Sequence, residues 1–475
     1  MFSTLVNTDS LVLTSGMTRF LFIIWSIATL GYAEDKKWNP VLVPEKKEGL
    51  INSDRKLEVF EHGIKKEWGY EAPQTDTFIV IHPEKPKKIA PLYVVLHSAG
   101  HDVFSAVECT KQVGNHDIYH SPSNFYALYV DCRANKGDWW WGGMHAKDAN
   151  LKKKNSGIET RPVERRVIDT IKWVIEKYEI DSNRVYLSGN SMGGSGALGI
   201  GLRHGNVFAA LKANVPAGID HADQRMAFSD HAAAKKLNLP DPPITLDYSG
   251  QNDGWSFGHD RFVKAMNDRK YPLYFYWGSF GHANNHERIL QVNDLINSFD
   301  WLSVKKNEAY PVFTNATSNN NLPWPNNLSD KKSGQVNAFF GWELMNDEKK
   351  SFNVSLYLNS ADDIKTKFDI PKKSTADVSL RRLQQFEVNE GDFINWSFGG
   401  SKGKMKIGSD KIITAPSLTI TTSPQTLSVW MNNNYPNIDV EYYFTDTGYE
   451  LQETYDYLDK LKTRLDKRIT YIQPT

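Results

Sequence analysis

The 475-residue sequence has little cysteine and no net charge, and each of these scarcities excludes a class of protein. Its two cysteines, Cys109 and Cys132, are too few for a scaffold built on disulfides. The 56 basic and 56 acidic residues leave a formal net charge of +0, which argues against a nucleic-acid partner or a membrane surface held by charge. No helix carries two histidines with a carboxylate, so we expect no metal and no other cofactor.

Hydrophobic runs long enough to cross a membrane are also missing. The apolar run Phe20–Leu30 is too short to span a bilayer, so no integral membrane span is predicted. One arginine precedes this run and a small-residue site ending at Ala33 follows it, which is the layout of a secretory signal peptide. We therefore expect residues 1–33 to be a signal peptide, with the true start at Met17, and the protein to be secreted or periplasmic. The two cysteines either pair in that oxidising compartment or remain buried thiols.

The length exceeds what one hydrophobic core usually supports, so more than one domain is expected. Strand-like and helix-like runs alternate over residues 50–305, which predicts an α/β domain with a doubly wound, mostly parallel sheet. Residues 306–333 are rich in Asn, Pro and Ser and are predicted to be a linker. Apolar residues alternate over residues 334–445, which predicts a small all-β, sandwich-like domain, and the charged residues 446–475 predict a helical tail.

The stretch Gly189-Asn190-Ser191-Met192-Gly193 places a serine between a β-branched apolar run and a small, apolar helical pattern. A sharp turn from strand to helix leaves almost no room for a Cβ two residues before or after the residue at the bend. The glycines meet that need, so we interpret the stretch as a nucleophile elbow that holds Ser191 at the positive end of a helix. A glycine-rich helix start is the simpler alternative.

A serine nucleophile needs a histidine to take its proton and a carboxylate to hold that histidine. In α/β-hydrolases the acid and then the histidine follow the serine, on loops after later strands. Asp253 and His282 both come just after strand-like runs and are predicted to be the acid and the base. Asp220 is the alternative acid, and His286 is the alternative base.

Backbone N–H groups must also stabilise the negative charge that develops on the substrate oxygen. Met192, directly after the serine, is predicted to supply one of them. The second is expected from Ala99 or Ser98, because small residues after a buried strand let the main chain approach the substrate. His97 is then a residue that shapes this loop, and not a base.

Four stretches of the sequence together resemble a known family: VVLHSAG, YEIDSNRVYLSGNSMGG, SGQNDGW and FGH. They resemble the α/β-hydrolase group that contains feruloyl esterases, acetylxylan esterases and polyhydroxybutyrate depolymerases, over roughly residues 57–302. The resemblance implies the same nucleophile, acid, base and oxyanion loop. Many relatives have His-Gly where this chain has His97-Ser98, and the C-terminal β domain lies outside the resemblance.

Several features bear on the substrate. Only about two dozen residues separate the strands on either side of Asp220, too few for the helical cap of many lipases, so we expect an open cleft. Trp140, Trp141 and Trp255 follow strand ends on the side where ligands bind, and they are predicted to contact the substrate or, alternatively, to pack beneath the loop. Trp324, Trp342 and Trp396 of the C-terminal region either stack on sugars or fill the core of the predicted sandwich, with the core favoured.

We therefore expect a secreted serine carboxylic-ester hydrolase that acts on acetyl or feruloyl groups of a polysaccharide or oligosaccharide. A serine peptidase of the prolyl-oligopeptidase type would use the same residues, but the chain has no room for its propeller domain. A polyester depolymerase stays open. The alternative outside enzymology is a secreted carbohydrate-binding protein whose hydrolase core is inactive.

Overall fold

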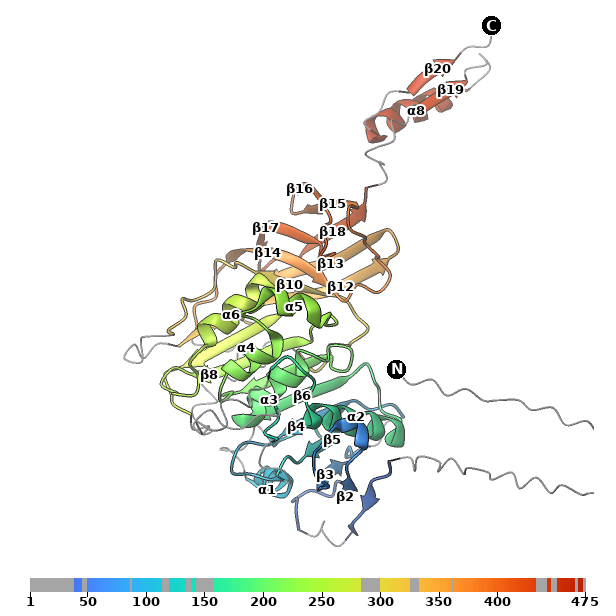
Figure 1. The fold of residues 1–475 in the computed structure, drawn as a ribbon. Helices are drawn as coiled ribbons and strands as arrows, with labels where there is room; N and C mark the ends of the chain where they lie inside the picture. Colours follow the sequence, from blue (N-terminus) through green and yellow to red (C-terminus); the bar gives the residue numbers. More distant parts are fainter. Residues whose placement is uncertain are drawn as a thin grey trace, which may run out of the picture. The chain divides into compact units, whose positions relative to one another are not determined.

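The computed structural model describes these residues: 38–44, 49–85, 88–112, 119–133, 138–141, 157–282, 300–324, 333–360, 362–364, 366, 368–432, 442–445, 451–465 and 469–472 (Figure 1). The expected signal peptide and Met17 lie outside these residues. In the described part of the chain, no helix is long and apolar enough to cross a membrane. The architecture below belongs to the unit that begins at Pro40.

A ten-stranded sheet forms the centre of the first domain, in the order β1-β2-β3-β5-β4-β6-β7-β8-β9-β11. The strands β5-β4-β6-β7-β8-β9 are parallel to one another, whereas β1, β2, β3 and β11 join antiparallel. The bounds are β1 Val41–Leu42, β2 Leu57–Gly63, β3 Thr75–Ile81, β4 Leu92–Leu96, β5 Tyr126–Val130, β6 Val185–Asn190, β7 Ala210–Asn214, β8 Ile244–Gly250, β9 Leu273–Gly278 and β11 Gly334–Val336.

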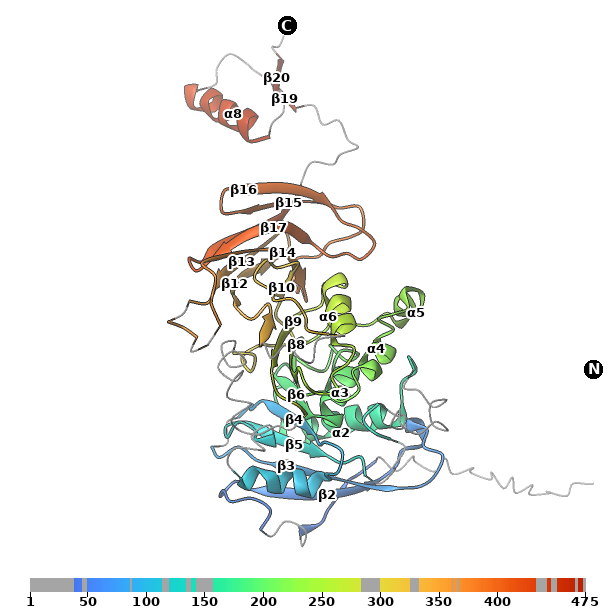
Figure 2. The same cartoon turned by 90° about the vertical axis from the view of Figure 1, so that its left-hand side faces the viewer.

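Helices cover both faces of this sheet, because its central strands are apolar on both sides. All residues of β4, β8 and β9 are buried. On one face, α2, α3, α4 and α6 share a core with the sheet, and α1 packs on the other face (Figure 2). The helices are α1 Val103–Glu108, α2 Pro162–Tyr178, α3 Met192–Gly201, α4 Asp220–Met226, α5 His231–Leu237 and α6 His259–Asp268, with 3₁₀ turns η2 Lys66–Trp68 and η3 Cys109–Lys111.

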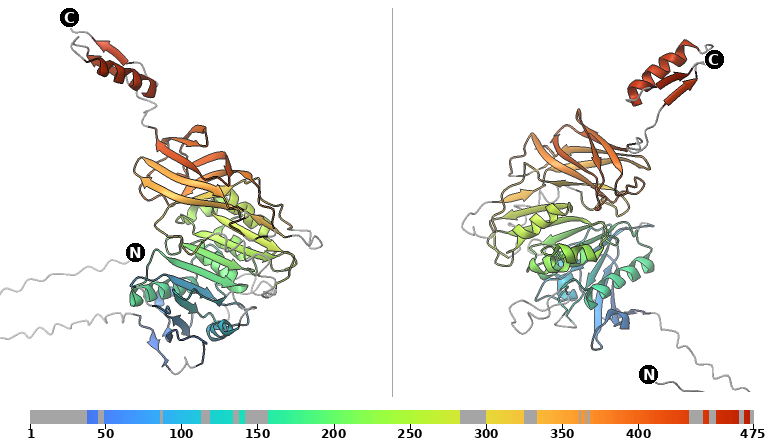
Figure 3. Two further views of the ribbon diagram at one scale, coloured as in Figure 1. Left: turned by 180° about the vertical axis from the view of Figure 1, so that it is seen from behind. Right: turned by 45° about the horizontal axis from the view of Figure 1, so that its top comes forward.

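Two antiparallel sheets follow and pack face to face (Figure 3). One has the order β10-β14-β17 and the other, which we call sheet C, has the order β12-β13-β18-β15-β16. Alternation in β13 buries Phe352, Val354, Leu356 and Leu358 between the sheets, as the sequence predicted. The bounds are β10 Tyr310–Thr314, β12 Phe340–Glu348, β13 Ser351–Leu358, β14 Lys373–Arg381, β15 Phe393–Phe398, β16 Ser401–Lys406, β17 Thr414–Thr421 and β18 Gln425–Met431.

The expected fold class, an α/β-hydrolase sheet followed by a small all-β region, is confirmed. The segments differ in detail from the predicted ranges. Tyr310–Thr314, within the predicted linker, forms β10, an edge strand that tolerates Pro311. Gly334–Val336 pairs with β9 and so completes the large sheet. The predicted helical tail contains α8 (Gln452–Leu465) and also β20 (Ile469–Ile472), which pairs with β19 (Tyr442–Thr445).

The two cysteines are buried and free, so the disulfide alternative is not realised in this structure. The sulfur atom of Cys132 lies 3.6 Å from Nε2 of His97, and that of Cys109 lies 3.9 Å from Nδ1 of His101. Burial raises the pKa of both thiols, so neither is a reactive thiolate at neutral pH.

Candidate active site

Ser191 lies at a sharp turn between strand β6 and helix α3, in the order that the sequence predicted. Its backbone has φ 56° and ψ −114°, a conformation that a residue with a side chain rarely adopts. Flanking hydrogen bonds hold this strained turn: the N–H of Ser191 donates to the carbonyl of Asn214, and its carbonyl accepts from the N–H of Ala217. The serine is partly exposed, although every residue of α3 is buried.

The two flanking glycines are required by close backbone contacts. A Cβ on Gly189 would lie 2.0 Å from the carbonyl oxygen of Gly193, and a Cβ on Gly193 would lie 2.1 Å from the carbonyl oxygen of Leu96. The second contact also brings the start of α3 against the end of β4. As a result, the two segments predicted to supply the oxyanion donors are direct neighbours.

The three residues predicted to form the triad lie in hydrogen-bond contact. Oγ of Ser191 is 2.8 Å from Nε2 of His282, and Nδ1 of His282 is 2.7 Å from Oδ2 of Asp253. Asp253 is buried, whereas the His282 side chain is 33% exposed. Nδ1 must carry a proton to donate to the carboxylate, which leaves Nε2 free to accept the serine proton.

Backbone hydrogen bonds join the two loops that carry Asp253 and His282. The N–H of Gln251 donates to Gly278, and the N–H of Asn252 donates to Phe280, at 2.7 and 3.0 Å. A Cβ on Gly250 would lie 2.4 Å from the carbonyl oxygen of Phe280, so only glycine permits this approach. The distance between the carboxylate and the imidazole is therefore set by paired main chains.

A second buried histidine–carboxylate pair lies behind Asp253, and sequence reasoning missed it. Nε2 of His259 is 3.0 Å from Oδ2 of Asp247, and Nδ1 of His259 is 2.6 Å from the carbonyl oxygen of Ser256. Both side chains are fully buried. The charge of Asp247 raises the pKa of His259 against the opposing effect of burial, and burial raises the pKa of Asp247.

This pair supports the turn that carries Asp253, the candidate catalytic acid. The N–H of Ser256 donates to the carbonyl of Asp253, and Oδ1 of Asp253 accepts from the N–H of Trp255 at 2.8 Å. Nε1 of Trp324 donates to Oγ of Ser256 at 2.8 Å. Trp324 precedes the β-rich region, so the chain beyond the hydrolase domain braces the turn of Asp253. Trp324 is buried, but in the core of the large sheet and not in that of the sandwich, where the sequence placed it.

The loop after β4 discriminates between the two candidates for the second oxyanion donor. The N–H of Ser98 donates to the hydroxyl of Tyr119 at 3.1 Å, and that hydroxyl donates to Oγ of Ser98 at 2.8 Å. The amide of Ser98 is therefore already engaged, which contradicts its predicted role as a donor. Ala99 is exposed and is the better candidate.

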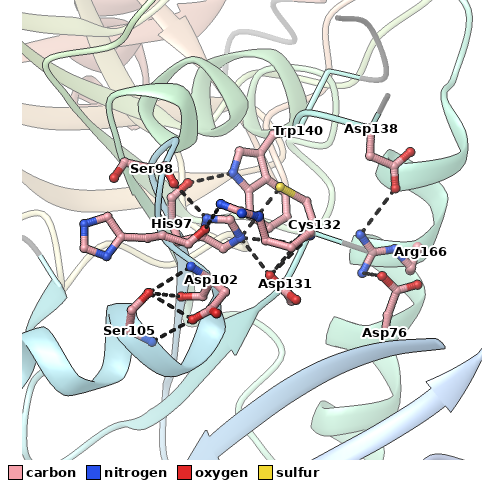
Figure 4. A network of polar contacts seen from close by, with 12 residues as sticks. Asp76, His97, Ser98, Asp102, Ser105, Asp131, Cys132, Asp138, Trp140 and Arg166 are labelled. Atoms are coloured by element: carbon pink, nitrogen blue, oxygen red, sulfur yellow. Dashed lines mark hydrogen bonds and ion pairs between the residues drawn. The ribbon is translucent and has the colours of Figure 1, made fainter. Parts of the chain in front are cut away.

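The ring of His97 lies against Ser98 and Asp131 (Figure 4), and through the Ser98 carbonyl it fixes the direction of the Ala99 amide. Nδ1 of His97 lies 2.9 Å from the carbonyl oxygen of Ser98, and the N–H of His101 donates to the same oxygen at 3.2 Å. In a trans peptide the carbonyl and the following N–H point in opposite directions, so the Ala99 N–H points away from His97. Asp131 holds the other side of the ring, with Oδ1 3.0 Å from Nε2.

Trp140 and Trp141 are packed into the core, whereas Trp139 is partly exposed. Trp140 is fully buried and donates from Nε1 to the carbonyl of His97, and Trp141 is 3% exposed and stacks on His221 at 4.1 Å between ring centroids. The prediction that both contact substrate is corrected by this burial. Trp139 has φ 26° in a turn, and both rings that follow it are directed inward.

A buried charge network holds the start of this turn (Figure 4). Asp138 lies 3.7 Å from Arg166, which lies 3.3 Å from Asp76, and Asp138 accepts a hydrogen bond from the hydroxyl of Tyr70. Burial raises the pKa of Asp138 to about 6, against the opposing charge of Arg166. The network anchors residue 138 and so favours insertion of the next rings into the core.

Trp255 stays a candidate for substrate contact, because it is partly exposed and its ring centroid lies 6.4 Å from that of His282. His221 lies on the adjacent segment, which is tied to the site by a hydrogen bond from the N–H of Gly218 to the carbonyl of Trp255. Sequence reasoning missed His221, and its position three residues after Gly218 gave no distinguishing signal.

The structure tests the alternative acid, Asp220, but not the alternative base, His286. Asp220 is exposed and forms an ion pair with Arg261, so it is not in contact with His282. His286 lies outside the described residues. Within the ranges that the structure describes, no group of three or more histidine, cysteine, aspartate or glutamate side chains could hold a metal ion.

No family model and no curated protein matches the chain. Among solved structures it is similar to a ferulic acid esterase, with 15% identity and a TM-score of 0.32 over 48% of this chain and 92% of that one. It is similar to a thermostable esterase, with 18% identity and a TM-score of 0.37 over 54% and 64% of the two chains. It is also similar to an S-formylglutathione hydrolase from Agrobacterium tumefaciens, with 14% identity and a TM-score of 0.33 over 49% and 91%. These likenesses are weak, and the strand order and the Ser191 turn define the fold.

Proposed function

We propose that this protein is a serine carboxylic-ester hydrolase with Ser191 as nucleophile, His282 as base and Asp253 as acid. The observation that carries the proposal is the continuous hydrogen-bonded chain from Ser191 Oγ through His282 to Asp253, at 2.8 and 2.7 Å, on a strained strand–helix turn. A serine in that position is partly exposed and at the N-terminus of α3, where the helix dipole favours developing negative charge.

The first half of the reaction forms an acyl-enzyme. Oγ of Ser191 attacks the ester carbonyl carbon while Nε2 of His282 takes the hydroxyl proton. The carbonyl π electrons move to oxygen, and the N–H groups of Met192 and Ala99 stabilise the resulting oxyanion. When the carbonyl re-forms, the bond to the alcohol oxygen breaks and His282 donates its proton to that oxygen.

The second half releases the acid. A water molecule gives a proton to Nε2 of His282 and attacks the acyl carbon, and the tetrahedral intermediate then expels Ser191 Oγ, which recovers the proton from His282. Asp253 stays ionised throughout, because it holds the imidazole in one tautomer and stabilises the imidazolium. All atoms are supplied by ester and water, so the reaction needs no cofactor.

The substrate is proposed to be an acetyl or feruloyl ester of a polysaccharide, met after secretion. The segment between β7 and β8 contains only the two short helices α4 and α5, and the side chain of His282 is 33% exposed. Both features suit a substrate that approaches from open solvent. Trp255, beside His282, supplies an aromatic surface for a sugar or a feruloyl ring.

The test is a release assay on acetylated, feruloylated and methyl-esterified polysaccharides, run beside peptide and polyester panels. The Ser191→Ala variant is the control, and p-nitrophenyl acetate reports esterase activity on a simple substrate. We expect ester release by the native protein, none by the variant, and labelling of Ser191 by a fluorophosphonate probe. Cleavage of peptides alone would establish the peptidase alternative, cleavage of polyester alone would correct the substrate, and failure to label Ser191 would favour a binding protein.

A further inference from the structure

Trp430, on strand β18, is 38% exposed on the β-rich region. Of the tryptophans that the sequence analysis named as candidates for stacking on sugars, Trp324 and Trp396 are buried, and Trp342 is partly buried against the core. Leu427 and Val429 of β18 point into the core between the two sheets. Side chains alternate along a strand, so Trp430 projects from the opposite side of sheet C.

The same alternation defines the whole outer face of sheet C. In β13 and β15 the buried apolar residues alternate with partly exposed ones. Cross-strand pairing places Ser351, Trp430, Asn395 and Lys404 in one row across four strands. On β13, β18, β15 and β16 the outer face comprises these four residues together with Asn353, Ser355, Phe393, Ser397, Lys402, Lys406, Thr426 and Ser428. Strand β12 adds Glu343, Asn346 and Glu348 at the edge of the sheet opposite the lysines, so the positive charge is confined to the β16 side of this face.

A line of three lysines borders this face along strand β16. Lys402, Lys404 and Lys406 are exposed, and they pair with Ser397, Asn395 and Phe393 of β15. Alternate residues of a strand are about 7 Å apart, so the three lysines leave the strand at evenly spaced positions on one face. Nζ of Lys404 lies 4.9 Å from the ring centroid of Phe393. Within the described residues, no carboxylate forms an ion pair with any of the three lysines.

We propose that the outer face of sheet C binds a polysaccharide chain that carries anionic groups, sulfate or carboxylate. The Trp430 ring stacks on the C–H face of a sugar, and the Asn395 amide and the serine hydroxyls bind its hydroxyl groups. The lysine row pairs with the anionic groups along the chain. Lysines on an edge strand also deter pairing with other chains, but that role does not need an exposed tryptophan on the same face of the sheet.

This inference rests on the proposed function, since it names the class of polymer on which the esterase would act, and it is tested separately from catalysis. The full chain with Ser191→Ala is run in native gels that contain κ-carrageenan, polygalacturonate or neutral arabinoxylan. Adding Trp430→Ala should weaken retardation in the anionic gels by about tenfold, the loss of one good stacking contact. Adding Lys402→Glu with Lys404→Glu and Lys406→Glu should weaken it by more than that, because three charges are reversed. Retardation should fall as salt rises.

The matched control is Lys66→Glu with Lys172→Glu and Lys236→Glu, which makes the same change in net charge at exposed lysines of the hydrolase domain. It should keep the retardation. The inference would be overturned if both triple variants lost retardation equally, or if neutral arabinoxylan retarded the protein as much as the anionic polymers do. It would also be overturned if the protein bound DNA or phosphatidylserine vesicles as well as it binds the anionic polymers. Self-association of the lysine variant with unchanged retardation would assign the lysines to edge protection instead. Hydrolysis of p-nitrophenyl acetate by the native chain reports on the proposed function independently.

Discussion

The imidazole of His97 holds the carbonyl oxygen of Ser98, with 2.9 Å between Nδ1 and that oxygen. The peptide unit that carries this carbonyl also carries the N–H of Ala99. Orientation of the ring therefore sets the direction of the proposed oxyanion donor, although the ring itself lies away from the reacting atoms. Asp131, at 3.0 Å from Nε2, completes the support.

Replacing His97 should separate this positioning role from general stability. The amide of Asn in His97→Asn can still donate to the Ser98 carbonyl, whereas His97→Leu cannot. We expect His97→Leu to lower kcat about 100-fold with KM little changed, the typical cost of one oxyanion donor, and His97→Asn to recover most of that loss. Steady-state kinetics and thermal unfolding of both variants test this. Equal losses in both variants would assign His97 to packing alone.

The assignment of the acid makes a second prediction. Asp253→Asn should lower kcat about 10⁴-fold, because an amide at this position favours the wrong tautomer of His282. Asp220→Asn should change kcat little, since the exposed Asp220 pairs with Arg261 and does not contact the imidazole. Hydrolysis of p-nitrophenyl acetate measures both. A larger effect at Asp220 would place the acid after β7.

The glycines of the Ser191 turn make a third prediction. Gly189→Ala and Gly193→Ala should prevent folding or abolish activity, because the new methyl group would overlap backbone carbonyls that cannot move independently. Gly63→Ala is the control, because a Cβ there meets nothing within 4 Å. Soluble expression and the thermal midpoint report the outcome. Normal folding of both turn variants with full activity would contradict the strained turn.

Much of the candidate site was predictable because its constraints are local. A serine between glycines after an apolar strand has few structural alternatives, and the chain order of acid and base follows from the sheet. Asp253 and His282 could therefore be chosen before their 2.7 Å contact was known. The exclusion of Ser98 could not be predicted, because it depends on Tyr119, which is remote in sequence and carries no motif.

The remaining differences also come from tertiary context. Three consecutive tryptophans do not reveal which of them enter the core, since the turn at Trp139 depends on how Asp138 meets Arg166. Strand β10 was hidden because Pro311 interrupts its pattern and only its edge position makes that residue acceptable. His259 and Asp247 lie on different elements, so their 3.0 Å contact had no sequence signature.

The support behind Asp253 makes a fourth prediction. Trp324→Phe removes the hydrogen bond to Ser256, which should cost about 1 kcal/mol of stability and lower kcat severalfold. His259→Leu should be much more damaging, because it leaves the buried carboxylate of Asp247 without its partner. Thermal unfolding, with kcat and its pH profile, measures both variants. A loss of stability with an unchanged kcat and pH profile would limit this pair to structural support.

The acid stability of the hydrolase domain makes the last prediction. Burial and the charge of Arg166 together lower the pKa of His62 to about 4, against the opposing effects of the hydrogen bond to the Gly63 carbonyl and the charge of Asp76. The ring therefore folds in its neutral form, so the unfolded state binds one more proton than the native state between pH 4 and 6.5. Stability present above pH 6.5 should be lost as the pH falls through this window.

His62→Phe tests that origin of acid sensitivity. His62 already packs against Trp68 and Phe78, with ring centroids at 5.7 and 5.8 Å, so an aromatic replacement fits the site. Unfolding of the variant should take up one proton fewer than unfolding of the native chain between pH 6.5 and 4. Its free energy of unfolding should therefore rise relative to that of the native chain as the pH falls through this range. Urea midpoints measured at intervals across this range give the slope. If the two proteins lose stability in parallel, other groups cause the acid sensitivity, and the carboxylates paired in the native state are the next to test.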